Sequence, residues 1–222
     1  MVDYVLLTTS LISAIVAYLA GVIFVTAYRR ERKSSRLLWG LAFILYALGH
    51  TIVVITTSME IGPTNPIYIT TTWLYINLSG AGTTGLVLFA TMTFVVKKAM
   101  VREIVTAIFV ALYVIGSAAF GFFLPGDTPL AVFNPSTHTQ LLNMSYWVIE
   151  LLIPVSFFIG LVFLRHFTTS GSRWAVLIGL SFLVYALVLF IWPIQDLKWL
   201  FYIIRTVSVG LLGLGGYLLA KE

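Results

Sequence analysis

The sequence predicts an all-α, polytopic integral membrane protein with seven transmembrane helices, and its composition carries most of that prediction. Of the 222 residues, 60% are hydrophobic and 9% are charged, and the mean hydropathy is +1.02. A water-soluble domain carries about 25% charged residues, so this chain has too few charges to cover a surface that faces water. The composition therefore excludes a soluble enzyme, a disordered regulator and a coiled coil, and it indicates a surface that faces lipid.

Seven apolar runs are long enough to cross a bilayer, which takes about 20 residues in a helix. The segments between the runs are too short for a separate soluble domain, so residues 1–222 are expected to form a single transmembrane domain. The predicted helices lie at 4–27, 37–58, 71–96, 103–124, 144–165, 174–193 and 198–220.

The residues around these runs justify their boundaries. The first run is expected to be a membrane helix and not a cleaved signal peptide, because Asp3 precedes it and its basic cluster follows it, which reverses the order of a signal sequence. Turn-forming Pro, Gly, Asn and Thr separate the second run from the third at 61–66, and the fourth from the fifth at 124–139. Tryptophans gather near the expected membrane boundaries, as in aromatic belts: Trp73, Trp147, Trp192 and Trp199 near one, Trp39 and Trp174 near the other.

The basic residues predict the orientation of the chain in the cell membrane. If the N-terminus is outside and the C-terminus inside, the cytoplasmic ends hold 11 of the 13 Lys and Arg residues. The basic pI of about 9.5 then reflects membrane orientation and contact with anionic lipid, and nucleic acid is not an expected partner. These residues are Arg29, Arg30, Arg32, Lys33, Arg36, Lys97, Lys98, Arg102, Arg165, Arg173 and Lys221.

An internal similarity links the two halves of the chain. Residues 40–48 and 179–187 share Gly, Phe and Tyr at the same spacing, at an offset of 139 residues. The same offset aligns 21–24 with 160–163. We expect a parallel repeat of helices 1–3 and 5–7, joined by helix 4, although chance similarity between apolar helices is the alternative. Parallel repeats build several transporters, whose sites lie near the middle of the membrane between the repeats.

This 3+1+3 arrangement resembles the group that holds the SWEET and PQ-loop transporters and the microbial rhodopsins. The resemblance is architectural, covers the whole chain and implies a small transporter or a receptor-like protein. The Pro-Gln pair of the PQ-loop group is absent, and Asn77 alone resembles the substrate asparagines of the SWEET group. No retinal is expected, because Lys198 and Lys221 lie at the two ends of the last helix and leave no lysine in its middle for a Schiff base.

Three ionisable residues lie inside the predicted helices, where their cost marks them as functional candidates: His50, Glu150 and Arg205. At a rise of 1.5 Å per residue they lie about 9–12 Å below the outer boundary. Asn77 lies at a similar depth, and we expect Glu150 and Arg205 to form an ion pair, since each is costly alone. The predicted outward-facing pocket for a ligand or a proton consists of His50, Asn77, Glu150, Arg205, Tyr46, Tyr146 and Tyr202.

Other chemistries lack the residues they need. The chain has no cysteine, and His50 and His166 lie at different depths, so neither a metal site nor a haem is expected. No sequence motif of an enzyme is present, so catalysis is not expected.

Three functions fit this pattern. The first is a small transporter or proton-coupled carrier for an anionic or polar solute. The second is a sensor that signals through a separate membrane partner. The third is a non-catalytic subunit of a larger membrane complex or homo-oligomer, with the charges as assembly contacts. The structural alternative to a functional pocket is that the buried charges only lock the helices of the bundle together.

Overall fold

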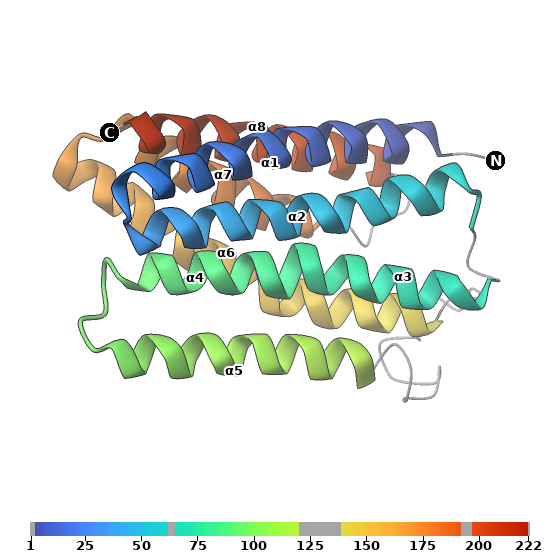
Figure 1. Cartoon of the computed structure of the whole chain (residues 1–222). Coiled ribbons are helices and arrows are strands. Elements are labelled where there is room, and N and C mark those ends of the chain that lie inside the picture. The colour runs from blue at the N-terminus through green and yellow to red at the C-terminus, as the bar shows by residue number, and fades with distance from the viewer. Residues whose placement is uncertain (1–2, 62–64, 120–138, 192–196, 222) are drawn as a thin grey trace.

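The structure is a computed structural model that describes residues 3–61, 65–119, 139–191 and 197–221 (Figure 1). All regular secondary structure within these residues is helical, which confirms the predicted all-α class with seven rods. The third rod joins three segments without a break, two α-helices and the π-helix η1 between them. The elements are α1 (Tyr4–Glu31), α2 (Ser34–Ser58), α3 (Pro66–Ile76), η1 (Asn77–Gly82), α4 (Thr83–Met92), α5 (Ala99–Ala118), α6 (Thr139–Ser170), α7 (Arg173–Leu189) and α8 (Lys198–Lys221).

The rods form a closed ring. Each rod packs against the next one along the chain, and α8 packs back against α1. The N-terminus lies at one end of the bundle and the C-terminus at the other (Figure 1). The α1–α2 and α4–α5 connections lie at the C-terminal end, so the basic clusters around Arg29–Arg36 and Lys97–Arg102 gather there. We call this end the basic end.

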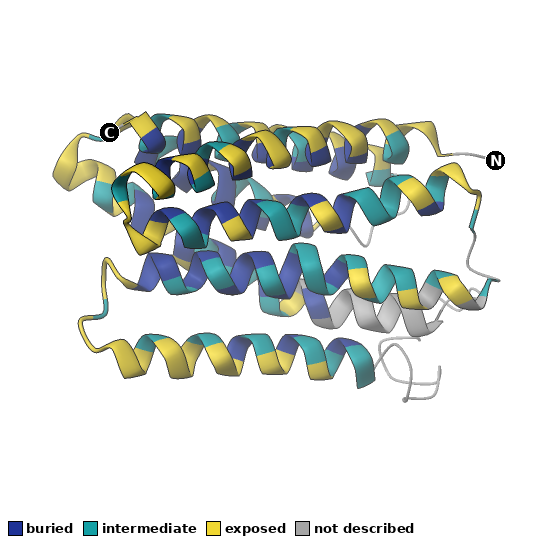
Figure 2. Cartoon of the chain, in the orientation of Figure 1, coloured by how far each residue is buried: buried dark blue, intermediate teal, exposed yellow. Residues whose placement is uncertain are grey.

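Length and apolar composition make the chain a multi-pass membrane protein. Five described helical stretches are long and apolar enough to cross a membrane: α1, α2, α5, the 150–170 part of α6, and α8. Helix α7 is apolar but has 17 residues. Large apolar side chains are exposed on the outer faces of the rods, most extensively on α5, where three side chains are buried (Figure 2). Such faces suit contact with lipid tails.

The observed helices differ from the predicted runs mainly at their ends. Helix α1 continues to Glu31, four residues past the apolar run, because polar residues can occupy the last helical turn. It ends where Arg32 adopts a left-handed conformation (φ 58°) and its amide donates to the Tyr28 carbonyl. The third rod covers 66–92 instead of 71–96, because Asn65 caps its start with Pro66 in the first turn.

Two helix crossings in the bundle have the same construction. Where α1 crosses α2, a Cβ added to Gly21 would lie 2.9 Å from Ile44 and 3.3 Å from the Gly40 carbonyl oxygen. Where α6 crosses α7, a Cβ added to Gly160 would lie 2.8 Å from Leu183 and 3.1 Å from the Gly179 carbonyl oxygen. Each residue of the second set lies 139 positions after its counterpart. Residues 36–50 and 175–189 also share the same burial class at every position. Glycine allows both backbones to approach this closely.

The π-helix η1 widens the third rod next to α2 and α5. Its turns carry an extra residue, so backbone carbonyls lose regular helical partners. Side chains bond to several of these carbonyls: Ser79 donates to Tyr75, and Tyr113 of α5 donates to Ile76. Tyr75, the second-to-last residue of α3, is thereby fixed at the edge of this distortion.

Candidate functional site

Arg205 of α8 lies in the interior and joins three helices. Its side chain is buried, with 4% exposure. Nη1 donates to the hydroxyl of Tyr75 on α3 at 2.8 Å, and Nη2 donates to the hydroxyl of Ser10 on α1 at 3.4 Å. The guanidinium also lies over the rings of Phe201 and Tyr202, at 5.7 and 5.4 Å from the ring centroids. Aromatic faces stabilise a cation at such distances.

His50 of α2 also contacts Tyr75. Its ring stacks on Tyr46 with centroids 4.1 Å apart, and it lies perpendicular to the ring of Tyr75 with centroids 5.2 Å apart. Nδ1 lies 3.0 Å from the Tyr46 carbonyl oxygen. A carbonyl can only accept, so Nδ1 carries a hydrogen and Nε2 holds the lone pair when the ring is neutral. Tyr75 therefore connects a titratable ring to the buried guanidinium.

Three buried polar atoms in this cluster have no hydrogen-bond partner among the described residues. They are Nε of Arg205, Nε2 of His50 and the hydroxyl of Tyr46. Ser13 lies close to that hydroxyl but does not meet hydrogen-bond geometry. At least nine in ten buried polar groups in proteins are bonded, so three such atoms in one place need an explanation. Water, an ion or a ligand between them would supply the missing partners.

The charge of Arg205 is not balanced by a carboxylate in the described part of the chain. The described carboxylates are Asp3, Glu31, Glu60, Glu103 and Glu150. Every ion pair recorded between described side chains involves Glu31, at the basic end. A buried charge without a counter-charge is costly, and the interior of a membrane protein increases this cost. Within the described residues, the positive charge of Arg205 is therefore offset only by neutral hydroxyls and aromatic rings.

Four predicted pocket residues lie together in this cluster: Tyr46, His50, Tyr202 and Arg205. The side chain of Tyr146 lies outside the described part of the structure.

Two predicted pocket residues lie elsewhere, and the predicted ion pair between Glu150 and Arg205 does not form. Glu150 is exposed on α6, and α7 packs against both α6 and α8, which keeps the two charges in different parts of the ring. Asn77 faces α5, where its Nδ2 donates to the Ser117 hydroxyl at 3.1 Å. Similar depth in the membrane did not imply a shared face, because depth leaves the rotation of each helix undefined.

The sequence analysis did not select Tyr75 and Ser10, the two hydrogen-bond partners of Arg205. Both are neutral and sit in apolar helices, where tyrosine and serine are usual packing residues. One available signal was the depth of Tyr75, which lies two positions before Asn77. Ser10 had a weaker signal, since it precedes the small residues Ser13, Ala17 and Gly21 on the same helix.

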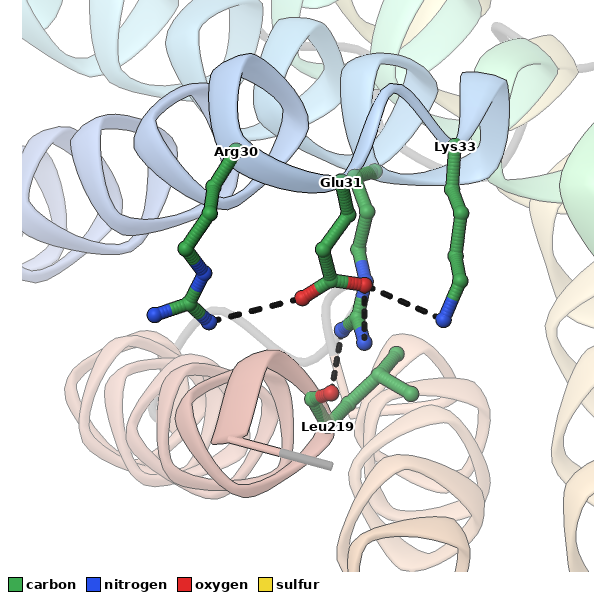
Figure 3. A network of polar contacts seen from close by, with 5 residues as sticks. Arg30, Glu31, Lys33 and Leu219 are labelled. Atoms are coloured by element: carbon green, nitrogen blue, oxygen red, sulfur yellow. Dashed lines mark hydrogen bonds and ion pairs between the residues drawn. The ribbon is translucent and has the colours of Figure 1, made fainter.

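A second polar cluster lies at the basic end and ties the α1–α2 turn to the end of α8 (Figure 3). Glu31 accepts contacts from three cations: Lys33 at 3.0 Å, Arg30 at 3.4 Å and Arg36 at 3.6 Å. Nη1 of Arg36 also donates to the carbonyl of Leu219. A cation at the C-terminal carbonyls of a helix complements the helix dipole, so this cluster stabilises the closure of the ring.

Comparison with known proteins finds no family model, no curated protein and no solved structure that matches this chain.

Proposed function

We propose that the chain is a small membrane transporter that binds an anion in the interior, at Arg205. The observation that carries this proposal is a guanidinium that is 4% exposed and contacts hydroxyls and rings but no described carboxylate. A bound anion would provide the counter-charge that the described residues do not.

The free edge of the guanidinium suits a carboxylate or a similar oxyanion. Nε and Nη2 point along one edge, and this edge can hold two oxygen atoms in parallel hydrogen bonds. Nε has no described partner, and Nη2 has only the long 3.4 Å bond to Ser10. Nη1, on the opposite side, is occupied by Tyr75 at 2.8 Å. Tyr75 thus orients the guanidinium and leaves its binding edge available.

His50 would allow proton coupling. Its Nε2 is buried without a described partner and can take up a proton. His50 lies within electrostatic range of Arg205. An anion next to Arg205 would favour protonation of His50, because opposite charges attract at short range in a medium of low dielectric. The anion and the proton would then cross together as a neutral pair.

The proposed transport mechanism uses two parallel halves of three rods each, α1–α4 and α6–α8. The matched glycine crossings at Gly21–Gly40 and Gly160–Gly179 support this division. The resemblance to the SWEET and PQ-loop group, in which such halves move against each other, agrees with it. We further propose that the basic end faces the cytoplasm and that the protein lies in the cell membrane with its N-terminus outside.

Uptake into proteoliposomes tests the proposal. Purified protein is reconstituted, and the uptake of labelled acetate and of chloride is followed with and without an inward proton gradient. Arg205→Gln should reduce uptake at least tenfold, because the amide keeps polarity but removes the charge. Arg29→Gln, an exposed arginine at the basic end, serves as the matched control and should leave uptake unchanged. Equal uptake by Arg205→Gln and the native protein would contradict the proposal, and anion binding without uptake would favour the sensor hypothesis.

The dependence of uptake on pH tests the role of His50. In the native protein, uptake should rise as the external pH falls, since protonated His50 adds a second positive charge beside Arg205. His50→Gln should bind the anion but lose most of this dependence. A pH profile of the His50→Gln variant that matches the native profile would remove His50 from the mechanism.

A further inference from the structure

Arg102 lies close to the start of α5, beside the α4–α5 connection at the basic end (Figure 1). Its Nη1 donates to the carbonyl of Val96 at 3.1 Å, and its guanidinium carbon lies 5.9 Å from the ring centroid of Phe89 on α4. These two contacts orient the guanidinium. The residue is only partly buried, so the guanidinium is reachable from outside the bundle.

The other side of this guanidinium has no partner among the described residues. Nη1 makes the one hydrogen bond recorded for the Arg102 side chain, and Nε is buried without a bond. Every ion pair between described side chains involves Glu31 and not Arg102. The hydroxyl of Thr106, one turn further along α5, is also buried and unbonded. Unbonded polar atoms at two successive turns point to a partner outside the described chain.

The charge around Arg102 favours an anionic partner. Lys97 and Lys98 are exposed in the adjoining connection, and Glu103 is the only acidic residue between positions 93 and 118. The three cations and one carboxylate give this stretch a net charge of +2. Basic residues at a membrane boundary attract anionic headgroups. The planar edge of a guanidinium matches the spacing of two phosphate oxygens.

An exposed apolar stripe continues from this charged group along α5 (Figure 2). Its members are spaced by three or four residues, which places them on one side of the helix: Val101, Val105, Ile108 and Leu112. From the first to the last of them the helix rises about 16 Å, which is half of a hydrocarbon core about 30 Å thick. The stripe therefore matches the length of one acyl chain in one leaflet.

We infer that an anionic phospholipid binds at the boundary between α4 and α5, with its phosphate on Arg102 and one acyl chain along the α5 stripe. One phosphate oxygen binds Nη2 at the surface, and a small outward rotation of the guanidinium brings Nε to a second oxygen. Lys97 and Lys98 repel the ammonium group of a zwitterionic lipid, so they favour a headgroup with net negative charge. This site lies on the outside of the bundle and does not depend on anion transport at Arg205.

Native mass spectrometry of the detergent-solubilised protein tests the inference. Binding of phosphatidylglycerol is compared with that of phosphatidylcholine carrying the same acyl chains, and the native protein should retain one phosphatidylglycerol in preference. Arg102→Gln should weaken this binding about tenfold or more, because a charge-assisted pair is lost. Arg29→Gln is the matched control, since it removes one exposed charge at the same end, and it should change binding by no more than about twofold.

A second pair of variants keeps the charge. Arg102→Lys replaces the planar guanidinium by a point charge and should restore only part of the binding, whereas Arg29→Lys should bind like the native protein. This pair also provides the comparison if Arg102→Gln does not fold, which thermal unfolding in detergent checks. Washing the loaded protein with inorganic phosphate should leave the lipid in place, because phosphate has no acyl chain to lie along α5.

Several outcomes would overturn the inference. Equal weakening by Arg102→Gln and Arg29→Gln would mean that the whole basic end attracts lipid without a defined site. Native binding by Arg102→Lys would remove the guanidinium edge as the binding group. Equal retention of the two lipids by the native protein would remove the preference for an anionic headgroup, and displacement by inorganic phosphate would assign the site to a soluble anion.

Discussion

Two arginines in this bundle are buried to nearly the same extent but have different partners. Arg36 is 5% exposed and Arg205 is 4% exposed. Arg36 lies at the basic end, near Glu31 and bonded to the Leu219 carbonyl. Arg205 lies in the interior, where it meets the hydroxyls of Tyr75 and Ser10.

The difference lies in charge compensation. Arg36 has a carboxylate nearby and the negative end of the α8 dipole beside it, so its charge serves to hold α1, α2 and α8 together. Arg205 has neutral donors and acceptors around it in the described structure, together with two further polar atoms that lack partners. Burial alone therefore does not identify a functional arginine. Among the described residues only Arg205 lacks a nearby carboxylate in this comparison, and a buried charge without a counter-charge is costly to the folded protein.

The largest expected effect on stability comes from Arg36. Arg36→Met should lower the free energy of unfolding by about 2–3 kcal/mol, the usual contribution of a buried hydrogen bond from a charged donor. The affinity for anions should stay unchanged, because the basic end lies far from Arg205 along α8. Unfolding of detergent-solubilised protein, followed by tryptophan fluorescence, measures the first quantity, and calorimetry measures the second.

Arg30→Met is the matched control for Arg36, because Arg30 contacts the same carboxylate from a side chain that is 73% exposed. An exposed ion pair contributes little to stability, so this variant should unfold like the native protein. Equal destabilisation by both substitutions would contradict the interpretation that Arg36 acts through burial and the Leu219 carbonyl.

Arg205 should show the opposite behaviour. Without a bound anion, the free energy of unfolding of Arg205→Met should equal that of the native protein or exceed it by about 1–2 kcal/mol. An apolar side chain of similar length then replaces a buried cation that no described carboxylate compensates. Stabilisation by added anion should be lost in this variant. If Arg205→Met instead loses as much stability as Arg36→Met, Arg205 is a structural residue like Arg36 and the comparison fails.

Most of the fold follows from hydropathy, since every apolar run corresponds to one rod. The first predicted run ends at residue 27, although α1 continues to Glu31, and the fifth starts at residue 144, although α6 begins at Thr139. Hydropathy records apolar side chains, whereas a helix ends where its backbone hydrogen bonds end. The π-helix η1 was not predicted. Its residues, Asn77–Gly82, are mostly small, but the segment packs closely against α2 and α5 through Gly82 and Gly80, and these contacts are not visible in the local sequence.

The candidate site was less predictable than the fold. Counting residues from a helix end gives the depth of His50 and Arg205 well, because the rise per residue is constant. Counting residues does not show which side chains of other helices lie next to His50 and Arg205. Glu150 and Asn77 have suitable depths, but their helices direct them away from Arg205. Tyr75 and Ser10 complete the site through hydroxyl groups, and a hydroxyl in an apolar helix is indistinguishable by sequence from a packing residue.

The smallest expected effect comes from Ser10. The Ser10→Ala variant tests whether Ser10 competes with the proposed anion for the guanidinium of Arg205 or itself contacts the anion. Ser10 accepts a bond from Nη2 at 3.4 Å, which is long for such a contact. Ser10→Ala should cost at most about 1 kcal/mol of stability, and it should tighten anion binding about twofold, because Nη2 no longer divides its donors between Ser10 and the anion.

Ser13→Ala is the matched control: Ser13 is also fully buried on α1, but its hydroxyl contacts Thr206 and not Arg205. Calorimetry with acetate compares the two variants. A tenfold loss of affinity in Ser10→Ala would show that Ser10 is itself a ligand contact. The anion would then be held by Nε of Arg205 together with the Ser10 hydroxyl, and not by the Nε and Nη2 edge of the guanidinium.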